Sequence, residues 1–278
     1  MRFKFLKVAG LSVVMVAAGV ALRGGFEAAR ARSDTLAPEP PRPVQRPALR
    51  IVAPPPRQDD ARSEPAPIRQ LPVSGDLPAF VAPGAPGATV VYLHGFCGDP
   101  RRIDEWAPTA QRHATVVAIY GDAPCRNRPG RYRFTADMKY LDYRIRRALG
   151  SVGKGLGPIV LVGYSEGAQR AEDLAWVYPD RYRRVALMSG PATPSFLKLR
   201  GAARVAVTRG GREYRRNYRI SAEQIERGGV EARYFELPKA AHGEFGPDAP
   251  RVMGTLFDWL LASAADRQNP TELENDAF

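Results

Sequence analysis

Proline is concentrated in one stretch of this 278-residue chain, and that stretch limits how much of the sequence can form a packed core. Fourteen of the 26 prolines fall between residues 37 and 87. Proline lacks a backbone N–H and is excluded from the interior of helices and sheets. We therefore expect residues 32–87 to be an extended, disordered linker. Roughly 190 residues remain, which is enough for one globular domain.

The N-terminus has the pattern of an export signal. Three basic residues among the first seven precede an uncharged apolar run over residues 8–22, as in the n- and h-regions of a signal peptide. Ala29-Arg30-Ala31 has the A-x-A form of a cleavage site. We expect residues 1–31 to be a signal peptide or, if uncleaved, a membrane anchor formed by residues 8–22. In either case the rest of the chain is exported, to the periplasm or the extracellular space.

The net charge of +12 does not by itself indicate a nucleic-acid partner. Residues 1–75 hold half of it, with 12 Lys and Arg against 6 Asp and Glu. Seven arginines and one acid lie between residues 200 and 219, which fits either a solvated loop or a surface for an anionic ligand. The sequence has no nucleic-acid fold signature, so we expect no nucleic-acid partner.

Short β-branched runs alternate with amphipathic stretches after the linker, which predicts an α/β fold. We expect a mostly parallel sheet of about six strands with helices on both faces and minimal or no cap, in a catalytic domain over residues 88–264. The acidic tail, residues 265–278, is expected to be disordered. The predicted strands are 89–93, 115–119, 159–162, 184–188, 205–208 and 232–237, and the predicted helices are 103–112, 134–149, 166–178, 222–227 and 250–264.

The strand predicted at 159–162 leads directly into Gly163-Tyr164-Ser165-Glu166-Gly167, with a predicted helix following. This is G-x-S-x-G in a strand-turn-helix context, the nucleophile elbow. The serine stands on a sharp turn, and the two glycines let neighbouring backbone pass close by. The helix N-terminus beneath the serine stabilises negative charge. Ser165 is therefore the candidate nucleophile.

The strand predicted at 89–93 ends in His94-Gly95-Phe96. With the serine motif, this resembles the α/β-hydrolase superfamily, in which the first core strand commonly ends in His-Gly. The GYSEGA string and the lack of an obvious cap are most similar to its small carboxylesterase, lipase and dienelactone-hydrolase branch. The resemblance implies an oxyanion hole formed by the backbone N–H groups of Phe96 and Glu166.

A serine nucleophile needs a base, and the chain has three histidines. His94 belongs to the His-Gly turn and His113 to the end of a predicted helix, whereas His242 follows the last predicted strand, where the superfamily places its catalytic histidine. Glu213 is the single carboxylate between residues 180 and 223 and follows the strand predicted at 205–208. Glu213 is therefore the candidate third member of a catalytic triad with Ser165 and His242. Alternatively, it forms surface ion pairs with the neighbouring arginines.

Cys97 and Cys125 are the only two cysteines. An even pair in an exported protein favours one disulfide over two free thiols. Both are predicted to follow adjacent strands at the carboxyl edge of the sheet. We therefore expect them to pair, with two buried thiols as the alternative.

These features predict a serine hydrolase that cleaves a small-molecule or lipid carboxylic ester through an acyl-enzyme, without cofactor or metal. An acyltransferase or thioesterase with the same triad is an alternative. So is a non-catalytic, envelope-tethered binding protein with this fold.

Overall fold

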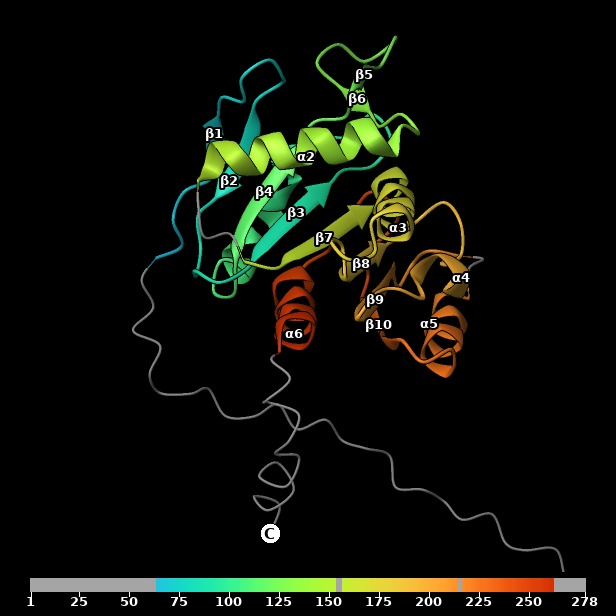
Figure 1. Ribbon diagram of the computed structural model, residues 1–278. Coiled ribbons are helices and arrows are strands. Elements are labelled where there is room, and N and C mark those ends of the chain that lie inside the picture. Colours follow the sequence, from blue (N-terminus) through green and yellow to red (C-terminus); the bar gives the residue numbers. More distant parts are fainter. Residues whose placement is uncertain (1–63, 154–156, 215–216, 263–278) are drawn as a thin grey trace, which may run out of the picture. The chain divides into compact units, whose positions relative to one another are not determined.

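The computed structural model describes residues 64–153, 157–214 and 217–262, and Figure 1 shows their arrangement. One sheet contains eight strands in the order β1-β2-β4-β3-β7-β8-β9-β10, and β5 pairs with β6 in a separate hairpin. The strands are β1 (Arg69–Leu71), β2 (Ala79–Ala82), β3 (Thr89–Leu93), β4 (Thr115–Ile119), β5 (Ala123–Pro124), β6 (Tyr132–Arg133), β7 (Ile159–Tyr164), β8 (Arg184–Met188), β9 (Arg204–Gly210) and β10 (Glu231–Leu237).

The six strands expected from the sequence form the parallel part of this sheet, from β4 to β10. The central residues of β3, β4, β7, β8 and β9 are buried, as expected for parallel strands covered on both faces. The edge strand β10 is more exposed at its centre. The expected α/β class and parallel topology are confirmed, with a somewhat larger strand count. The connection from β8 to β9 contains one helix of four residues, α4 (Phe196–Leu199), so no sizeable cap is inserted there.

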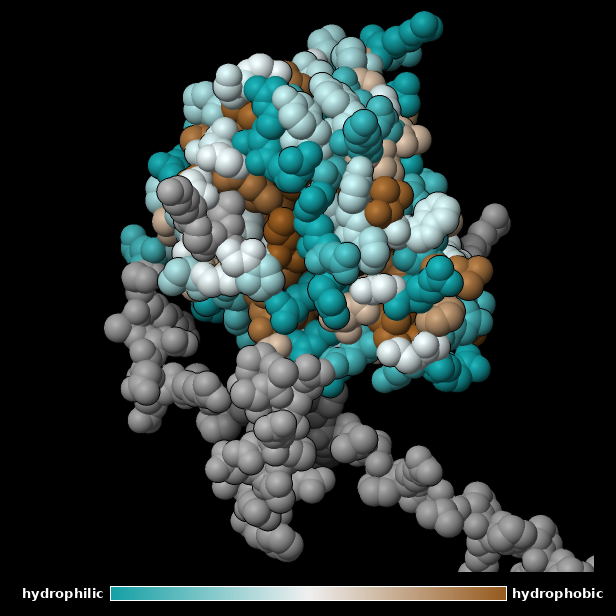
Figure 2. Space-filling view, in the orientation of Figure 1, coloured by the Kyte–Doolittle hydropathy of each residue, from teal (hydrophilic) through white to brown (hydrophobic). Residues whose placement is uncertain are grey.

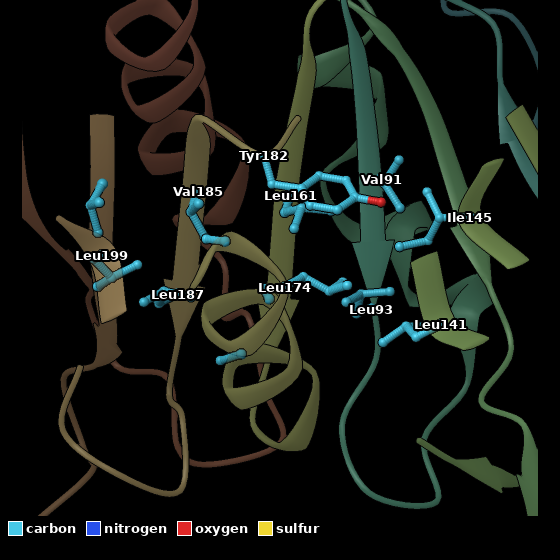
Figure 3. Packing of buried hydrophobic residues seen from close by; sticks show 14 of the residues in the cluster. Val91, Leu93, Leu141, Ile145, Leu161, Leu174, Tyr182, Val185, Leu187 and Leu199 are labelled. Atoms are coloured by element: carbon cyan, nitrogen blue, oxygen red, sulfur yellow. The ribbon is translucent and has the colours of Figure 1, made fainter. Parts of the chain in front are cut away.

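Helices cover both faces of the sheet (Figure 1). α2 (Met138–Val152), α3 (Glu166–Val177) and α5 (Tyr218–Arg227) pack on one face, where Leu141, Ile145 and Leu174 meet strand residues such as Leu161 (Figure 3). The 3₁₀ helix η1 (Pro100–Glu105), α1 (Ala107–Ala110) and α6 (Ala249–Leu261) cover the other, in a cluster around Trp106. The molecule therefore has three layers and two apolar cores.

The expected linker is wrong over its C-terminal part, because β1 and β2 extend the sheet with antiparallel pairing to β4. Pro72, Pro78 and Pro83 flank these strands instead of interrupting them, and proline is tolerated at such positions. Val81 is fully buried. The domain therefore begins well before residue 88. The N-terminal segment 1–31, the linker up to residue 63 and the tail 265–278 lie outside the described residues.

The helix predicted at 103–112 is divided into η1 and α1. Trp106 between them has non-helical φ and ψ of −145° and −13°. Pro108 explains the break, because it has no N–H to donate to the carbonyl four residues earlier. The helix predicted at 134–149 starts later, at Met138, where the Asp137 carboxylate accepts the Tyr140 N–H at 2.9 Å and caps the first turn.

Two interactions attach the β5–β6 hairpin region to the loop after β3. Cys97 and Cys125 form the expected disulfide, with Cα atoms 6.0 Å apart. His94 lies beside it. Its Nε2 accepts the Gly121 N–H at 3.0 Å, so Nδ1 carries the proton and donates to the Gly95 carbonyl at 2.7 Å. The loops that follow the adjacent strands β3 and β4 are therefore joined covalently and by hydrogen bonds.

Burial lowers the pKa of His94 to about 4. The imidazole is 1 % exposed, and a proton on Nε2 would also remove the acceptor for Gly121. His94 is thus a neutral structural histidine at physiological pH.

No helix among the described residues is long and apolar enough to cross a membrane.

Removing the disulfide should destabilise the domain. The two cysteines are 28 residues apart, and a cross-link over such a loop contributes about 2–4 kcal/mol. Urea unfolding of the Cys97→Ser/Cys125→Ser double variant should show a free energy of unfolding lower by that amount. An unchanged value would mean that the hydrogen bonds alone hold the two loops together.

Neutral His94 should also make stability depend on pH. Between pH 6.5 and about 4 the unfolded chain binds a proton at this residue and the folded chain does not, so stability falls as pH falls. Relative to His94→Gln, which cannot titrate, the wild type should lose about 3 kcal/mol between pH 7 and pH 4. Urea unfolding at both pH values measures the difference. Parallel losses in the two proteins would contradict it.

Candidate active site

Ser165 occupies a strained turn between β7 and α3. Its φ and ψ are 53° and −117°, a region that non-glycine residues rarely adopt. Its N–H donates to the Met188 carbonyl of β8 at 2.8 Å. A Cβ on Gly163 would lie 2.2 Å from the Gly167 carbonyl oxygen, and one on Gly167 would lie 2.0 Å from that of Leu93. Both glycines of the motif are therefore required sterically, as the sequence predicted.

The structure brings His242 to Ser165, 77 residues away in the sequence. The Nε2 atom of His242 lies 3.1 Å from Ser165 Oγ, within hydrogen-bond distance. His242 stands on the loop between β10 and α6. Its imidazole is well placed to accept the hydroxyl proton. His113 has another position, with Nε2 3.4 Å from the Asp258 carboxylate of α6.

Glu213 approaches the other nitrogen of the same imidazole. Its Oε2 is 3.7 Å from His242 Nδ1, which is longer than a hydrogen bond. Its Oε1 accepts the hydroxyl of Ser189 at 2.6 Å, and its side chain is 11 % exposed. Glu213 thus faces His242 and Ser189. Arg212 makes no ion pair with it among the described residues, and residues 215–216 lie outside them.

The loops that carry Glu213 and His242 are joined to each other. The N–H of Gly211 donates to the Leu237 carbonyl at 2.8 Å, and the N–H of Arg212 donates to the Ala240 carbonyl at 3.0 Å. These bonds extend the pairing of β9 with β10 beyond the strands. The backbones that carry Glu213 and His242 are therefore held side by side.

Three further residues hold this arrangement, and the sequence did not identify them as site residues. The Tyr164 hydroxyl accepts the N–H of Gly243 and interacts with Ser189, whose own hydroxyl donates to Glu213. The Arg102 guanidinium donates to the Gly243 carbonyl. The peptide groups on both sides of Gly243 are thus held in place, directly beside His242.

Burial has the largest effect on the pKa of the Tyr164 hydroxyl and raises it above the usual value. The group remains a neutral phenol and can both accept and donate a hydrogen bond. The sequence contains features that could have identified two of these residues as site residues. Tyr164 lies inside the serine motif, and Ser189 follows the carboxyl end of β8. Arg102 had none, because it reaches the site from η1.

One expected oxyanion donor directly follows Ser165, and the other lines the same cleft as Ser165. Glu166 is the first residue of α3, and its N–H has no acceptor within the described part of the chain. Phe96 follows Gly95, where an added Cβ would lie 3.2 Å from Ser165 Cβ. The Glu166 carboxylate accepts the Phe134 N–H at 2.9 Å, and burial is the largest effect that raises its pKa. Its side chain thus anchors the chain after β6.

An open cleft of about 710 Å³ lies over Ser165 and His242. This volume is within the range of small-molecule sites. Its walls come from the loop after β3, from Arg128, Pro129 and Arg131 of the hairpin, and from Tyr164 and Gly243. The described residues contain no group of three or more His, Cys, Asp or Glu side chains that could hold a metal ion.

No protein-family model matches the chain, and no curated protein matches it either. The structure is similar to fluorophosphonate-binding serine hydrolase F of Staphylococcus aureus, with 11 % identity, a TM-score of 0.53, and 72 % of this chain and 100 % of that chain covered.

Two further solved structures are similar at the same level. A carboxylesterase of Bacillus cereus has 16 % identity and a TM-score of 0.51, covering 67 % of this chain and 95 % of its own. A dienelactone hydrolase of Anabaena variabilis has 17 % identity and a TM-score of 0.51, covering 71 % and 97 %. At these identities the likeness concerns the fold. The chain has the α/β-hydrolase fold, with the hydroxyl of Ser165 and the imidazole of His242 in hydrogen-bond contact at the carboxyl edge of its sheet.

Proposed function

We propose that this protein is a serine esterase that hydrolyses carboxylic esters through an acyl-enzyme intermediate. The observation that carries the proposal is the 3.1 Å contact between His242 Nε2 and Ser165 Oγ, made on a positive-φ turn at the start of a helix. A serine hydroxyl in a cleft beside an imidazole is the arrangement of an activated nucleophile.

In the proposed reaction, the Ser165 oxygen attacks the ester carbonyl while His242 Nε2 takes its proton. His242 then returns this proton to the departing alcohol as the carbonyl–oxygen bond breaks, which leaves an acyl group on Ser165. Water attacks the acyl group with the same base, and the carboxylic acid leaves. Glu213 stabilises the imidazolium from the Nδ1 side. Its 3.7 Å separation from Nδ1 should shorten when the imidazole becomes charged.

The negative charge of the tetrahedral intermediate would be stabilised by the N–H groups of Phe96 and Glu166. The Glu166 N–H lies at the N-terminus of the twelve-residue helix α3, whose dipole favours an anion at this position. Phe96 belongs to the loop that the disulfide and His94 hold at its ends. Both donors are thus on rigid elements, as an oxyanion hole requires.

The structural relatives support ester hydrolysis, since carboxylesterase and dienelactone hydrolase structures share the fold. We further propose that the protein acts in the cell envelope. This is supported by the signal-like N-terminus and by the disulfide, because disulfides persist mainly in exported proteins.

The purified full chain should hydrolyse p-nitrophenyl acetate, and Ser165→Ala should lower kcat by about 10³-fold or more, because it removes the hydroxyl that lies within hydrogen-bond distance of His242. Release of p-nitrophenolate measures the rate. A fluorophosphonate probe should label the wild type and spare the variant. Hydrolysis at equal rates by both proteins would reject Ser165 as the nucleophile. A folded wild type without activity or labelling would indicate a binding protein instead.

Glu213→Gln should lower kcat by about 10²-fold with little change in KM, because the amide no longer stabilises the imidazolium. The matched control is Glu223→Gln, which changes an exposed glutamate on α5 and should keep wild-type kinetics. Steady-state kinetics on both variants, with thermal unfolding to check folding, make the comparison. Similar losses in the two variants would argue against a role for Glu213.

A further inference from the structure

The β5–β6 hairpin forms one wall of the cleft and is firmly attached to the wall beside it. Besides the disulfide, an isolated β-bridge joins Gly98 to Tyr132. The hairpin projects beyond the carboxyl ends of the central strands (Figure 1), and its tip is hydrophilic (Figure 2). The backbone of this hairpin is therefore held beside the site.

The turn of the hairpin is also ordered internally. Cys125 N–H donates to the Arg131 carbonyl at 2.9 Å, Arg128 N–H to the Cys125 carbonyl at 3.3 Å, and Arg131 N–H to the Arg128 carbonyl at 3.0 Å. Both backbone polar groups of Arg128 are thus bonded. Arg128, which lines the cleft, therefore stands on a closed turn.

The charges that line the cleft are unequal. Three arginines and one carboxylate, Asp99, contribute to its wall. The Asp99 carboxylate forms ion pairs with Arg131 at 3.0 Å and with Arg101 at 2.7 Å. Arg101 does not line the cleft. Arg102 forms an ion pair with Glu105. Within the ranges that the structure describes, Arg128 has no carboxylate partner. The cleft over Ser165 therefore carries one uncompensated guanidinium.

We infer that Arg128 determines substrate specificity, and that the preferred ester bears a carboxylate on its acyl or alcohol part. The inference rests on the proposed esterase function. A guanidinium forms paired, charge-assisted hydrogen bonds with a carboxylate. The mouth of a cleft lined by positive charge also concentrates anions. Arg102 and Arg131 already form ion pairs with Glu105 and Asp99. Arg128 is therefore the arginine of the cleft that can bind an anionic ligand.

The test compares two p-nitrophenyl esters of six-carbon acids, the hexanoate and the hydrogen adipate. They differ by one terminal carboxylate, and that carboxylate is too far from the ester to attack it readily. kcat/KM is measured for both with the full-length wild type, with Arg128→Gln and with Arg126→Gln. Arg126 is an exposed arginine of the same loop that does not line the cleft.

Arg128→Gln should lower the ratio of kcat/KM for the adipate to that for the hexanoate by about fivefold to tenfold, mainly through KM. Arg126→Gln should leave the ratio as in the wild type. Raising the salt concentration should reduce the wild-type ratio and not that of Arg128→Gln. An unchanged ratio in Arg128→Gln, or an equal fall in Arg126→Gln, overturns the inference while the esterase function stands.

A binding measurement separates failure of the inference from failure of the proposed function. Ser165→Ala, alone and combined with Arg128→Gln, is titrated with both esters by calorimetry. If the wild type hydrolyses neither ester, the esterase proposal is wrong. Tighter adipate binding that disappears with Arg128→Gln would still support the anion site, and equal binding of the two esters would reject it.

Discussion

The site depends on one steric constraint at the end of β7, where three backbone segments pass one another without side chains between them. Gly163 lies against Gly167, and Gly167 lies against the end of β3, at distances that no Cβ would allow. This close approach forces Ser165 into a positive φ and turns the chain directly into α3. The strain is held by the sheet, since the Ser165 N–H continues the pairing with β8.

The other members of the site reach Ser165 because parallel strands end at the same edge of the sheet. Their separation is then set by hydrogen bonds between the loops, which join the loop after β9 to the loop after β10. Tyr164 and Arg102 hold the peptide groups around Gly243 from two directions. His242 is 56 % exposed. These bonds hold its backbone, and its ring lies against Tyr164, Ser165 and Glu213.

The cleft is open, and its chemical character comes from the hairpin that forms its wall. A disulfide and a neutral histidine attach this region to the loop that carries Phe96. The same attachment thus fixes the proposed oxyanion donor and positions Arg128. With only a four-residue helix between β8 and β9, the substrate selection that we propose would fall to charged groups on this small hairpin instead of a large cap.

The sequence by itself determined the parallel strands and the serine turn, because these follow from local periodicity and from steric rules within a few residues. It pointed to Glu213 and His242 through the resemblance to the α/β-hydrolase superfamily, which places a carboxylate and a histidine after the last strands. It did not reveal β1 and β2, since prolines on their flanks resemble a linker when their partner strand is unknown. Only the tertiary structure decided the contacts of Arg102 and Ser189 and the charge left on Arg128. Those contacts depend on which loops, far apart in the sequence, meet in the fold, and no local sequence pattern specifies that.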